Sequence, residues 1–222
     1  MRRLLLPALA LAAAACGAGS AAAPPDPGSL LEESWTAMAA VETASFEMTR
    51  SGAPVTIEGF EFASAVGRYA APASAEAVLR VKAGDITVEM GTISVNERTW
   101  LTNPLTGRWE ELTPGTGFNP AVLFDPETGW TALLADLTDV SLVATGQGTH
   151  HLTGNIPGER VNTLTAGIAE AQSVLLHLWL DDSTGLITRL ELSTTGEAGV
   201  SDWVLVLTDY GEPVQIEPPI AE

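Results

Sequence analysis

Positive charge and cysteine are both scarce in this chain, and each shortage excludes a class of function. Its 222 residues include 10 Lys and Arg against 28 Asp and Glu, and Lys82 is the only lysine. The formal net charge is −18. Because such a surface repels phosphate backbones and anionic headgroups, we expect neither nucleic-acid binding nor electrostatic docking on a membrane. The single cysteine, Cys16, cannot form an internal disulfide.

Catalytic motifs are also missing. The sequence has no P-loop, no Gly-x-Ser-x-Gly elbow and no Cys-x-x-Cys pair, and its paired glycines lack the setting of a dinucleotide loop. His150 and His151 are adjacent, so on a strand they point to opposite faces, and His177 is distant in sequence. We therefore predict no enzyme activity, no catalytic residues, no cofactor and no metal site.

The N-terminus has the pattern of a signal peptide. Two arginines precede a short apolar core at residues 4–11, and small residues at 12–15 lead to Cys16. The apolar core is too short to span a membrane as a helix. We predict a signal peptide over 1–15 and a diacylated Cys16 that anchors the protein to the cell membrane, facing the extracytoplasmic side. Ordinary secretion with an incidental cysteine is the alternative.

After the cysteine, the chain divides into a tether and one domain. Residues 16–28 are small residues and prolines without apolar periodicity, which predicts a lipidated, flexible tether. The chain as a whole is 45% hydrophobic and 17% charged. This composition and length predict a single well-buried domain over 29–222.

Most of that domain has the two-residue periodicity of β-strands. In 174–192, the alternate residues Val174, Leu176, Leu178 and Leu180 predict one apolar strand face. The turn at 181–185 follows, in which an Asp carboxylate can accept backbone N–H groups and Gly185 can adopt positive φ. Ile187 is expected on the polar face of the second strand. Similar turns at 103–107 and 125–129 and further alternation up to Thr208 predict a meandering antiparallel sheet.

Two amphipathic helices are predicted to cover this sheet. The first extends over 30–43, where Ser29 and Glu32 match a capping box. The second extends over 126–136, with Asp125 as its N-cap. Their apolar stripes contain Leu31, Trp35, Met38 and Val41, and Trp130, Leu133, Leu134 and Leu137. The stripes either pack directly on the sheet or also form the roof of a ligand cavity.

The order of several segments resembles the LppX/LprAFG family of bacterial envelope lipoproteins. These segments are ISVNERTWLTNPLTGRWEEL, NPAVLFDPETGWTALLADL, LWLDDSTGLITRLEL and LTDYGEPVQIEPP, and the resemblance extends from Leu30 to Pro219. It implies a LolA/LolB-like α+β fold, mainly β. In this fold a strongly curved antiparallel sheet, or half-barrel, has helices covering its concave apolar face.

The same resemblance implies a lipid-binding function. Family members are expected to bind lipid or glycolipid acyl chains and carry them across or towards the outer cell envelope. An envelope transporter or a lipid-accepting protein would be the partner. The acidic surface argues against an anionic glycolipid.

A chain poor in Phe and Tyr but rich in Ala, Val and Leu favours a void beneath the helices. The residues expected to line it are Trp35, Met38, Phe124, Trp130, Leu133, Leu134, Leu137, Leu176 and Leu178. The alternative is a filled core. In that case the protein is a non-enzymatic interaction or sensory module that binds an envelope protein through its acidic surface.

Overall fold

One antiparallel sheet organises the chain in this computed structural model, which describes residues 24–57, 59–113, 119–125, 127–165 and 167–219. Its edges are β7 and β8, and β2 pairs with β3 beside the main order β7-β6-β5-β4-β3-β1-β12-β11-β10-β9-β8. The strands are β1 (Thr43–Gly52), β2 (Thr56–Ile57), β3 (Phe60–Ala70), β4 (Ser74–Ala83), β5 (Ile86–Val95), β6 (Arg98–Thr102), β7 (Trp109–Glu111), β8 (Thr138–Gly146), β9 (Thr149–Ile156), β10 (Val174–Asp181), β11 (Ile187–Gly196) and β12 (Gly199–Thr208).

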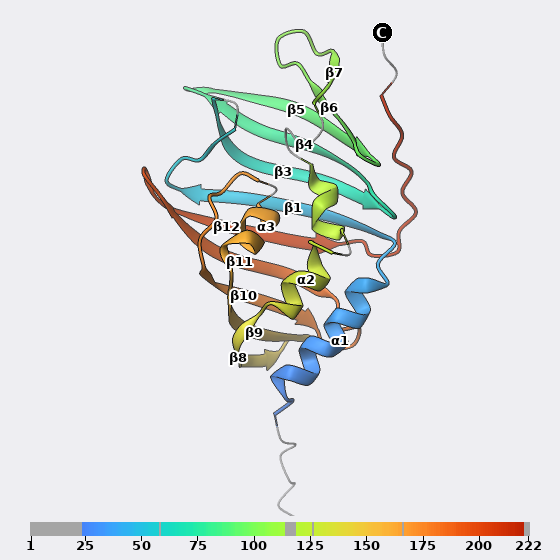
Figure 1. Cartoon of the computed structure of the whole chain (residues 1–222), viewed down its shortest axis with the longest axis vertical. Coiled ribbons are helices and arrows are strands. Elements are labelled where there is room, and N and C mark those ends of the chain that lie inside the picture. The colour runs from blue at the N-terminus through green and yellow to red at the C-terminus, as the bar shows by residue number, and fades with distance from the viewer. Residues whose placement is uncertain (1–23, 58, 114–118, 126, 166, 220–222) are drawn as a thin grey trace, which may run out of the picture.

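Strand β1 joins two meanders at the middle of this sheet. On one side it pairs with β3, and β4 to β7 follow outward in chain order. On the other side it pairs with β12, and β11 to β8 follow in reverse order. The first and last strands of the chain are therefore neighbours, and their pairing joins the two meanders into one sheet (Figure 1).

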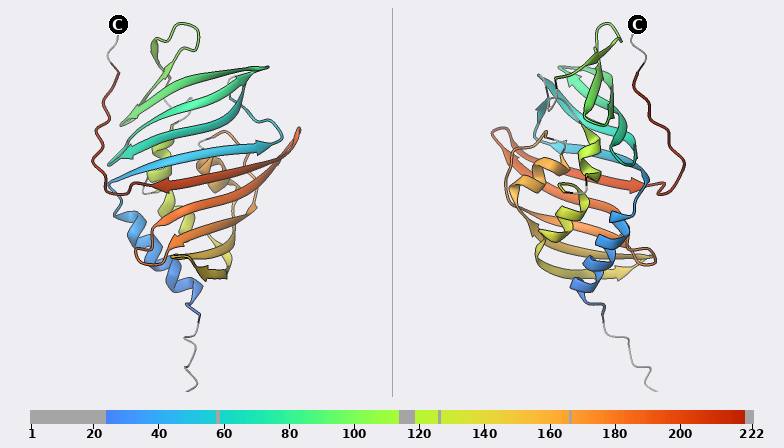
Figure 2. Two further views of the ribbon diagram at one scale, coloured as in Figure 1. Left: turned by 180° about the vertical axis from the view of Figure 1, so that it is seen from behind. Right: turned by 45° about the vertical axis from the view of Figure 1, so that its right-hand side comes forward.

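The helices lie on a single face of the sheet, as the views from three sides show (Figures 1 and 2). They are α1 (Pro27–Ala39), the 3-10 helix η1 (Pro120–Phe124), α2 (Trp130–Ala135) and α3 (Gly158–Leu164). We call the sheet face beneath them the inner face and the opposite one the outer face. The predicted mainly-β antiparallel architecture with helices on one face is confirmed. The sheet is open and is not strongly curled, so the expected half-barrel curvature is absent.

Helix α1 begins earlier than predicted because a different residue caps it. The Asp26 carboxylate accepts a hydrogen bond from the Ser29 backbone N–H at 2.9 Å, and Pro27 occupies the first helical position. Asp26 therefore takes the capping role expected of Ser29. The helix also ends at Ala39, four residues before the predicted end.

The start of α2, by contrast, was predicted too early. The Asp125 carboxylate accepts hydrogen bonds from the backbone N–H groups of Glu127 and Thr128, which closes a turn instead of capping a helix. The helix begins only at Trp130, after Gly129. A Cβ on Gly129 would lie 2.3 Å from the Leu123 carbonyl oxygen, so the chain requires glycine at this close approach.

The hairpin of β10 and β11 confirms the predicted turn. Asp181 Oδ1 accepts hydrogen bonds from the backbone N–H groups of residues 183 and 184, and Gly185 has φ of 71°. One assignment beyond the turn was wrong. A bulge pairs Trp179 with Arg189 and Leu180 with Ile187, which leaves Thr188 as the extra residue. Ile187 therefore points inward and is completely buried.

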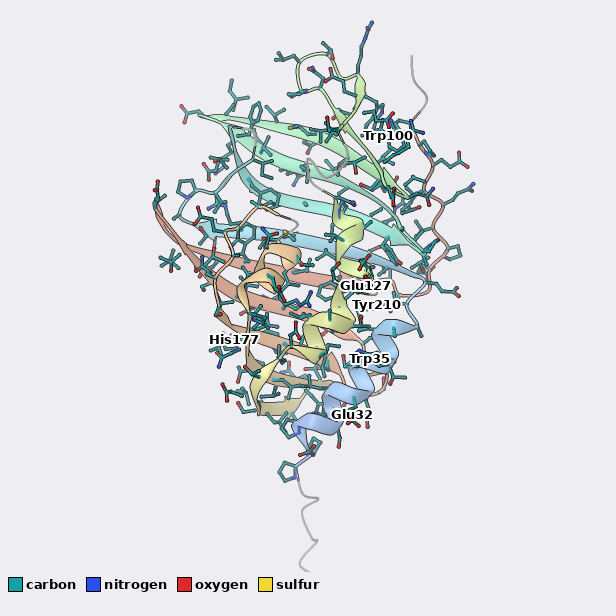
Figure 3. The ribbon with its side chains drawn as sticks, in the orientation of Figure 1. Glu32, Trp35, Trp100, Glu127, His177 and Tyr210 are labelled. Atoms are coloured by element: carbon teal, nitrogen blue, oxygen red, sulfur yellow. The ribbon has the colours of Figure 1, made fainter. Side chains whose placement is uncertain are left out.

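Helix α1 presents a different side to the sheet than predicted. Its buried residues are Leu30, Ser34 and Met38, spaced four apart, whereas Trp35 is 47% exposed (Figure 3). The small hydroxyl residue Ser34 sits at the buried position, so the helix can lie close to the sheet. No helix among the described residues is long and apolar enough to cross a membrane.

Candidate functional site

Most of the residues that the sequence predicted to line a cavity are buried on the inner face of the sheet. Seven of the predicted lining residues are buried there, Phe124 is partly buried against the core, and Trp35 lies outside it. The fully enclosed side chains come from both helices and sheet, so they form one apolar layer between the two. The seven are Met38, Trp130, Leu133, Leu134, Leu137, Leu176 and Leu178.

Side chains fill much of this interior. A void bounded by Met48, Leu164 and Trp203 with their neighbours measures about 10 Å³. That volume holds at most about one water molecule, so an acyl chain does not fit into it. An acyl chain could occupy this place, between α3 and strands β11 and β12, only if the side chains around it moved apart.

Aromatic rings join α2 to the sheet. Phe124 stacks on Tyr69 of β3 with ring centroids 3.9 Å apart and planes 6° apart. On its other side, Phe124 meets Trp130 edge-on at 5.9 Å. Burial, with a smaller contribution from the nearby Asp125 charge, raises the pKa of Tyr69. The stack fixes the position of the helix layer over β3.

Helices α1 and α2 each contain a buried polar atom without a partner. The Ser34 hydroxyl of α1 and the indole N–H of Trp130 on α2 have no hydrogen-bond partner among the described residues. The two helices pack against each other. A buried polar group left unpaired costs about 1–3 kcal/mol. These two groups are therefore places where an external hydrogen-bonding group would stabilise the protein.

Tyr210, from the segment after β12, connects α1 to the hairpin. Its hydroxyl donates a hydrogen bond to the Ile187 carbonyl at 2.5 Å and lies 3.8 Å from the sulfur of Met38 (Figure 3). Burial raises the pKa of Tyr210 well above its ordinary value, so the hydroxyl stays protonated and remains a donor.

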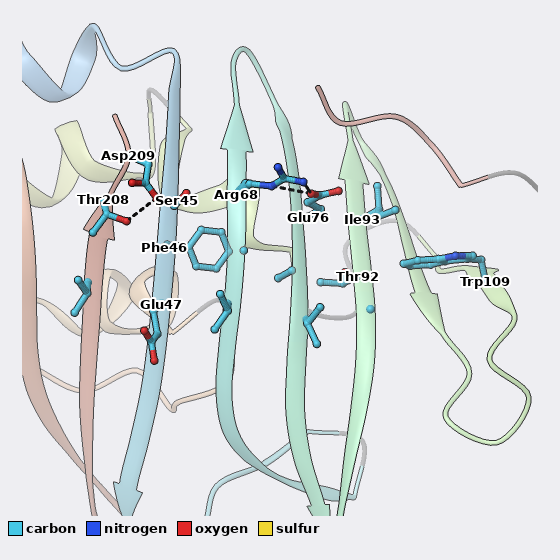
Figure 4. Close-up of a pocket in the computed structure, with 16 residues that line it drawn as sticks. Ser45, Phe46, Glu47, Arg68, Glu76, Thr92, Ile93, Trp109, Thr208 and Asp209 are labelled. Carbon is cyan, nitrogen blue, oxygen red and sulfur yellow. Dashed lines mark hydrogen bonds and ion pairs between the residues drawn. The ribbon is translucent and has the colours of Figure 1, made fainter. Parts of the chain in front are cut away.

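The outer face has a hollow of about 600 Å³ that the sequence analysis did not identify (Figure 4). Val66 and Val78 on its floor are 51% and 46% exposed, and the Arg68–Glu76 ion pair borders it. Trp109 lies over Gly91, where a Cβ would come within 2.8 Å of the indole ring. The sequence contained a signal in β4, since Val78 alternates with the buried residues Leu79 and Val81.

Two histidines also meet on the outer face, at the other end of the sheet. Register places His151 of β9 opposite Trp179 of β10, next to His177, which is on the same face (Figure 3). His151 Nε2 and His177 Nδ1 are 3.1 Å apart. His150 points the other way, as predicted. The pairing was missed because 26 residues separate the two histidines in the chain.

Two sequence predictions concern other chemistry. Within the described ranges no group of three or more His, Cys, Asp and Glu residues could hold a metal ion. Cys16, the predicted lipidation site, lies outside the described residues.

The fold places this chain in a class of proteins in which short helices cover the apolar face of one open antiparallel sheet. Within that class, the chain belongs to the LppX_LprAFG lipoprotein family, whose model matches residues 26–216. An LprA protein of Mycobacterium bovis is 27% identical over 123 residues, which are 51% of this chain and 49% of that protein. Lipoprotein LprA of Mycobacterium tuberculosis is 27% identical over 111 residues, 46% of this chain and 44% of its own. The chain thus matches about half the length of these relatives.

Solved structures share the fold over most of the chain. LprF from Mycobacterium bovis has a TM-score of 0.66 at 16% identity and covers 88% of this chain and 98% of its own. LppX from Mycobacterium tuberculosis has a TM-score of 0.58 at 15% identity and covers 87% and 100%. A LolA-superfamily protein of Nitrosomonas europaea reaches only 0.28, which is too low to support a conclusion about function.

Proposed function

We propose that this protein is a non-enzymatic, membrane-anchored lipoprotein that binds lipid or glycolipid acyl chains between its helices and its sheet and carries them towards the outer cell envelope. The continuous apolar inner face supports this function most directly. Leu176 and Leu178 from the sheet and Leu133 from α2 are at most 1% exposed and belong to one cluster of buried hydrophobic residues. An acyl chain would replace these contacts with equivalent ones.

Binding would require the helix layer to separate from the sheet, because the side chains of both layers are buried in one apolar cluster. Helices α2 and α3 have six and seven residues, too few for independent stability, so their position depends on packing. The indole N–H of Trp130 and the Ser34 hydroxyl would donate to an ester carbonyl at the polar end of the lipid. The bound state would then satisfy two groups that are unpaired in the closed state.

Lipid extraction tests the proposal. Protein purified from a bacterial membrane should contain acyl lipid detectable by mass spectrometry. Leu134→Trp adds volume under the helices and should lower bound lipid per protein. Leu175→Trp is the matched control, because Leu175 lies on the outer face of β10 and is 51% exposed. It should leave the lipid content unchanged. The absence of lipid from the wild type, with a loss of about 1–3 kcal/mol in Leu134→Trp from overpacking, would reject lipid carriage.

The anchor has its own test. We propose that Cys16 carries the acyl chains, because it is the only cysteine and follows a short apolar segment with small residues. Cys16→Ala should move the protein from the membrane fraction to the soluble fraction. Equal membrane retention of variant and wild type would require another anchor.

An interaction module with a permanently filled core is the second candidate. The burial of the inner layer and the apolar hollow around Val66, Val78 and Trp109 on the outer face both favour it. It predicts a wild type without extractable lipid and a partner whose capture is lost in Trp109→Ser. Lipid capture that is unaffected by Trp109→Ser would favour the carrier.

A further inference from the structure

The outer face of β9, β10 and β11 carries an aromatic and charged cluster that has no part in the apolar interior. Its members project from three adjacent strands on the side away from the helices. Two strand-to-strand pairs, His151 with Trp179 and Trp179 with Arg189, form one row, and the next row pairs His177 with Glu191. We define the histidine cluster as His151, His177, Trp179, Arg189 and Glu191.

We infer that His151 Nε2 and His177 Nδ1 form a two-nitrogen site for a divalent first-row transition metal, Cu²⁺ in preference to Zn²⁺. The two nitrogens are 3.1 Å apart. Two imidazole nitrogens bound to one metal at about 2.0–2.1 Å and at angles of about 90–109° are separated by about 2.8–3.4 Å. The observed distance lies within this range, so a metal can bridge the rings once each ring turns its lone pair towards the shared ion.

Neighbouring side chains hold the rings in place. Trp179 stacks on His151 with centroids 4.1 Å apart and planes 8° apart, so the imidazole plane is fixed. Arg189 lies 5.8 Å from the centre of the Trp179 ring and donates to the Glu191 carboxylate at 2.7 Å. The cluster is therefore preorganised by stacking and by one ion pair, as ligand rings in metal sites generally are.

The protonation state also suits a metal. Burial lowers the pKa of His151, and the nearby His177 lowers it further, whereas Glu191 opposes the shift. His151 is thus neutral at neutral pH, the form that binds metals. Glu191 and the net charge of −18 attract a cation without competing for the nitrogen lone pairs.

Binding needs a tautomer change and a rotation of the two rings, because their facing nitrogens now point along the line of the hydrogen bond. One ring now donates its N–H to the other nitrogen. That proton moves through solvent to the other nitrogen of the same ring, which frees both facing lone pairs, and no net proton is released. Since the described residues offer no third His, Cys, Asp or Glu in position, water completes the coordination. Affinity for such imidazole sites follows the order Ni²⁺ < Cu²⁺ > Zn²⁺.

The test is a Cu²⁺ titration of the full chain in detergent, followed by calorimetry and by electron paramagnetic resonance. We expect one Cu²⁺ per chain with a spectrum showing nitrogen ligands. Loss of even an outer partner of a metal ligand commonly lowers affinity 10- to 100-fold, so His151→Ala and His177→Ala should each weaken binding by at least about tenfold. His150→Ala, on the same strand but the opposite face, is the matched control and should bind as the wild type does.

Fluorescence gives an independent measurement. Trp179 contacts His151, so bound Cu²⁺ should quench it, and Trp179→Phe should remove most of the quenching while stoichiometry stays at one. A wild type that binds Cu²⁺ no more tightly than His177→Ala, with both folded by circular dichroism, would overturn the inference. So would equal loss of binding in His150→Ala, because binding would then not depend on the paired rings.

Discussion

The two faces of strand β10 differ sharply in burial and in chemistry. Its inner side chains are completely buried in the apolar layer beneath the helices: Leu176, Leu178 and Leu180. Its outer side chains alternate with them and are half-buried or exposed: Leu175, His177 and Trp179. This strand of eight residues thus contributes side chains to the core from one face and to the histidine cluster from the other.

This difference separates stability from chemistry. Inner contacts are apolar and non-directional, so they contribute through the area removed from water. Outer contacts depend on ring planes and nitrogen positions, such as the 3.1 Å approach of His151 to His177, and contribute little to burial. Substitutions on the inner face should therefore change the free energy of unfolding, and those on the outer face should change ligand binding.

The largest expected effect comes from the inner face. Leu178→Ala removes a fully buried side chain and should lower the free energy of unfolding by about 2–5 kcal/mol, because a cavity is left behind. Urea denaturation monitored by circular dichroism measures this change. Leu175→Ala, on the outer face of the same strand, should stay within about 0.5 kcal/mol of the wild type. Similar losses in both variants would contradict the contrast between the two faces.

The next effect concerns the turn that joins β10 to β11. Gly185 has φ of 71°, and a Cβ there would lie 3.3 Å from the carbonyl carbon of Glu33 in α1. Gly185→Val should lower stability by about 1–3 kcal/mol, since a β-branched residue is strained at positive φ. Gly146→Ala is the matched control, because Gly146 has open space and no positive φ. An unchanged melting temperature in Gly185→Val would show that the turn tolerates a side chain.

A smaller effect depends on pH. Hydrogen bonds from Ser183 and Thr184 lower the pKa of Asp181 to about 2 from 3.8. Because the folded-state pKa is the lower one, the ionised carboxylate stabilises the turn fully above about pH 4 and loses this effect as pH falls towards 2. The melting-temperature difference between wild type and Asp181→Asn should therefore shrink over that range. A difference that stays constant would mean that the charge has no role.

The smallest effect is expected at an ion pair on the outer face. Arg80 and Glu89 are 2.9 Å apart, and both side chains are more than half exposed. Their coupling in a double-mutant cycle with alanine should be about 0–1 kcal/mol, because water screens exposed charges. Salt should reduce it further. A coupling as large as the Leu178→Ala loss would remove the distinction between the faces.

Local patterns predicted much of the secondary structure. The alternation at 174–180 and the turns at 103–107 and 181–185 all correspond to observed elements. Each depends on residues close in sequence: side-chain alternation, an Asx hydrogen bond or a glycine with positive φ. Errors occurred where two local signals compete, as at Ser29, where Asp26 provides the better cap.

The candidate sites were less predictable because they depend on packing between elements. Periodicity placed Trp35 and Met38 on one stripe, but the approach of α1 to the sheet buries Ser34 and leaves Trp35 outside. The bulge at Thr188 reverses the alternation in β11 and buries Ile187. Neither outcome follows from residues within one turn or one strand.

The sequence by itself determined the class of fold, the positions of most strands and turns, the acidic surface and the candidate acylation residue, since each depends on composition or on neighbours in the chain. Only the tertiary structure decided that β1 pairs with β12, that the helices cover a buried apolar layer and that His151 meets His177. Strand order, packing volume and cross-strand contacts are long-range properties. They depend on how separate elements fit together, and local sequence patterns do not specify that fit.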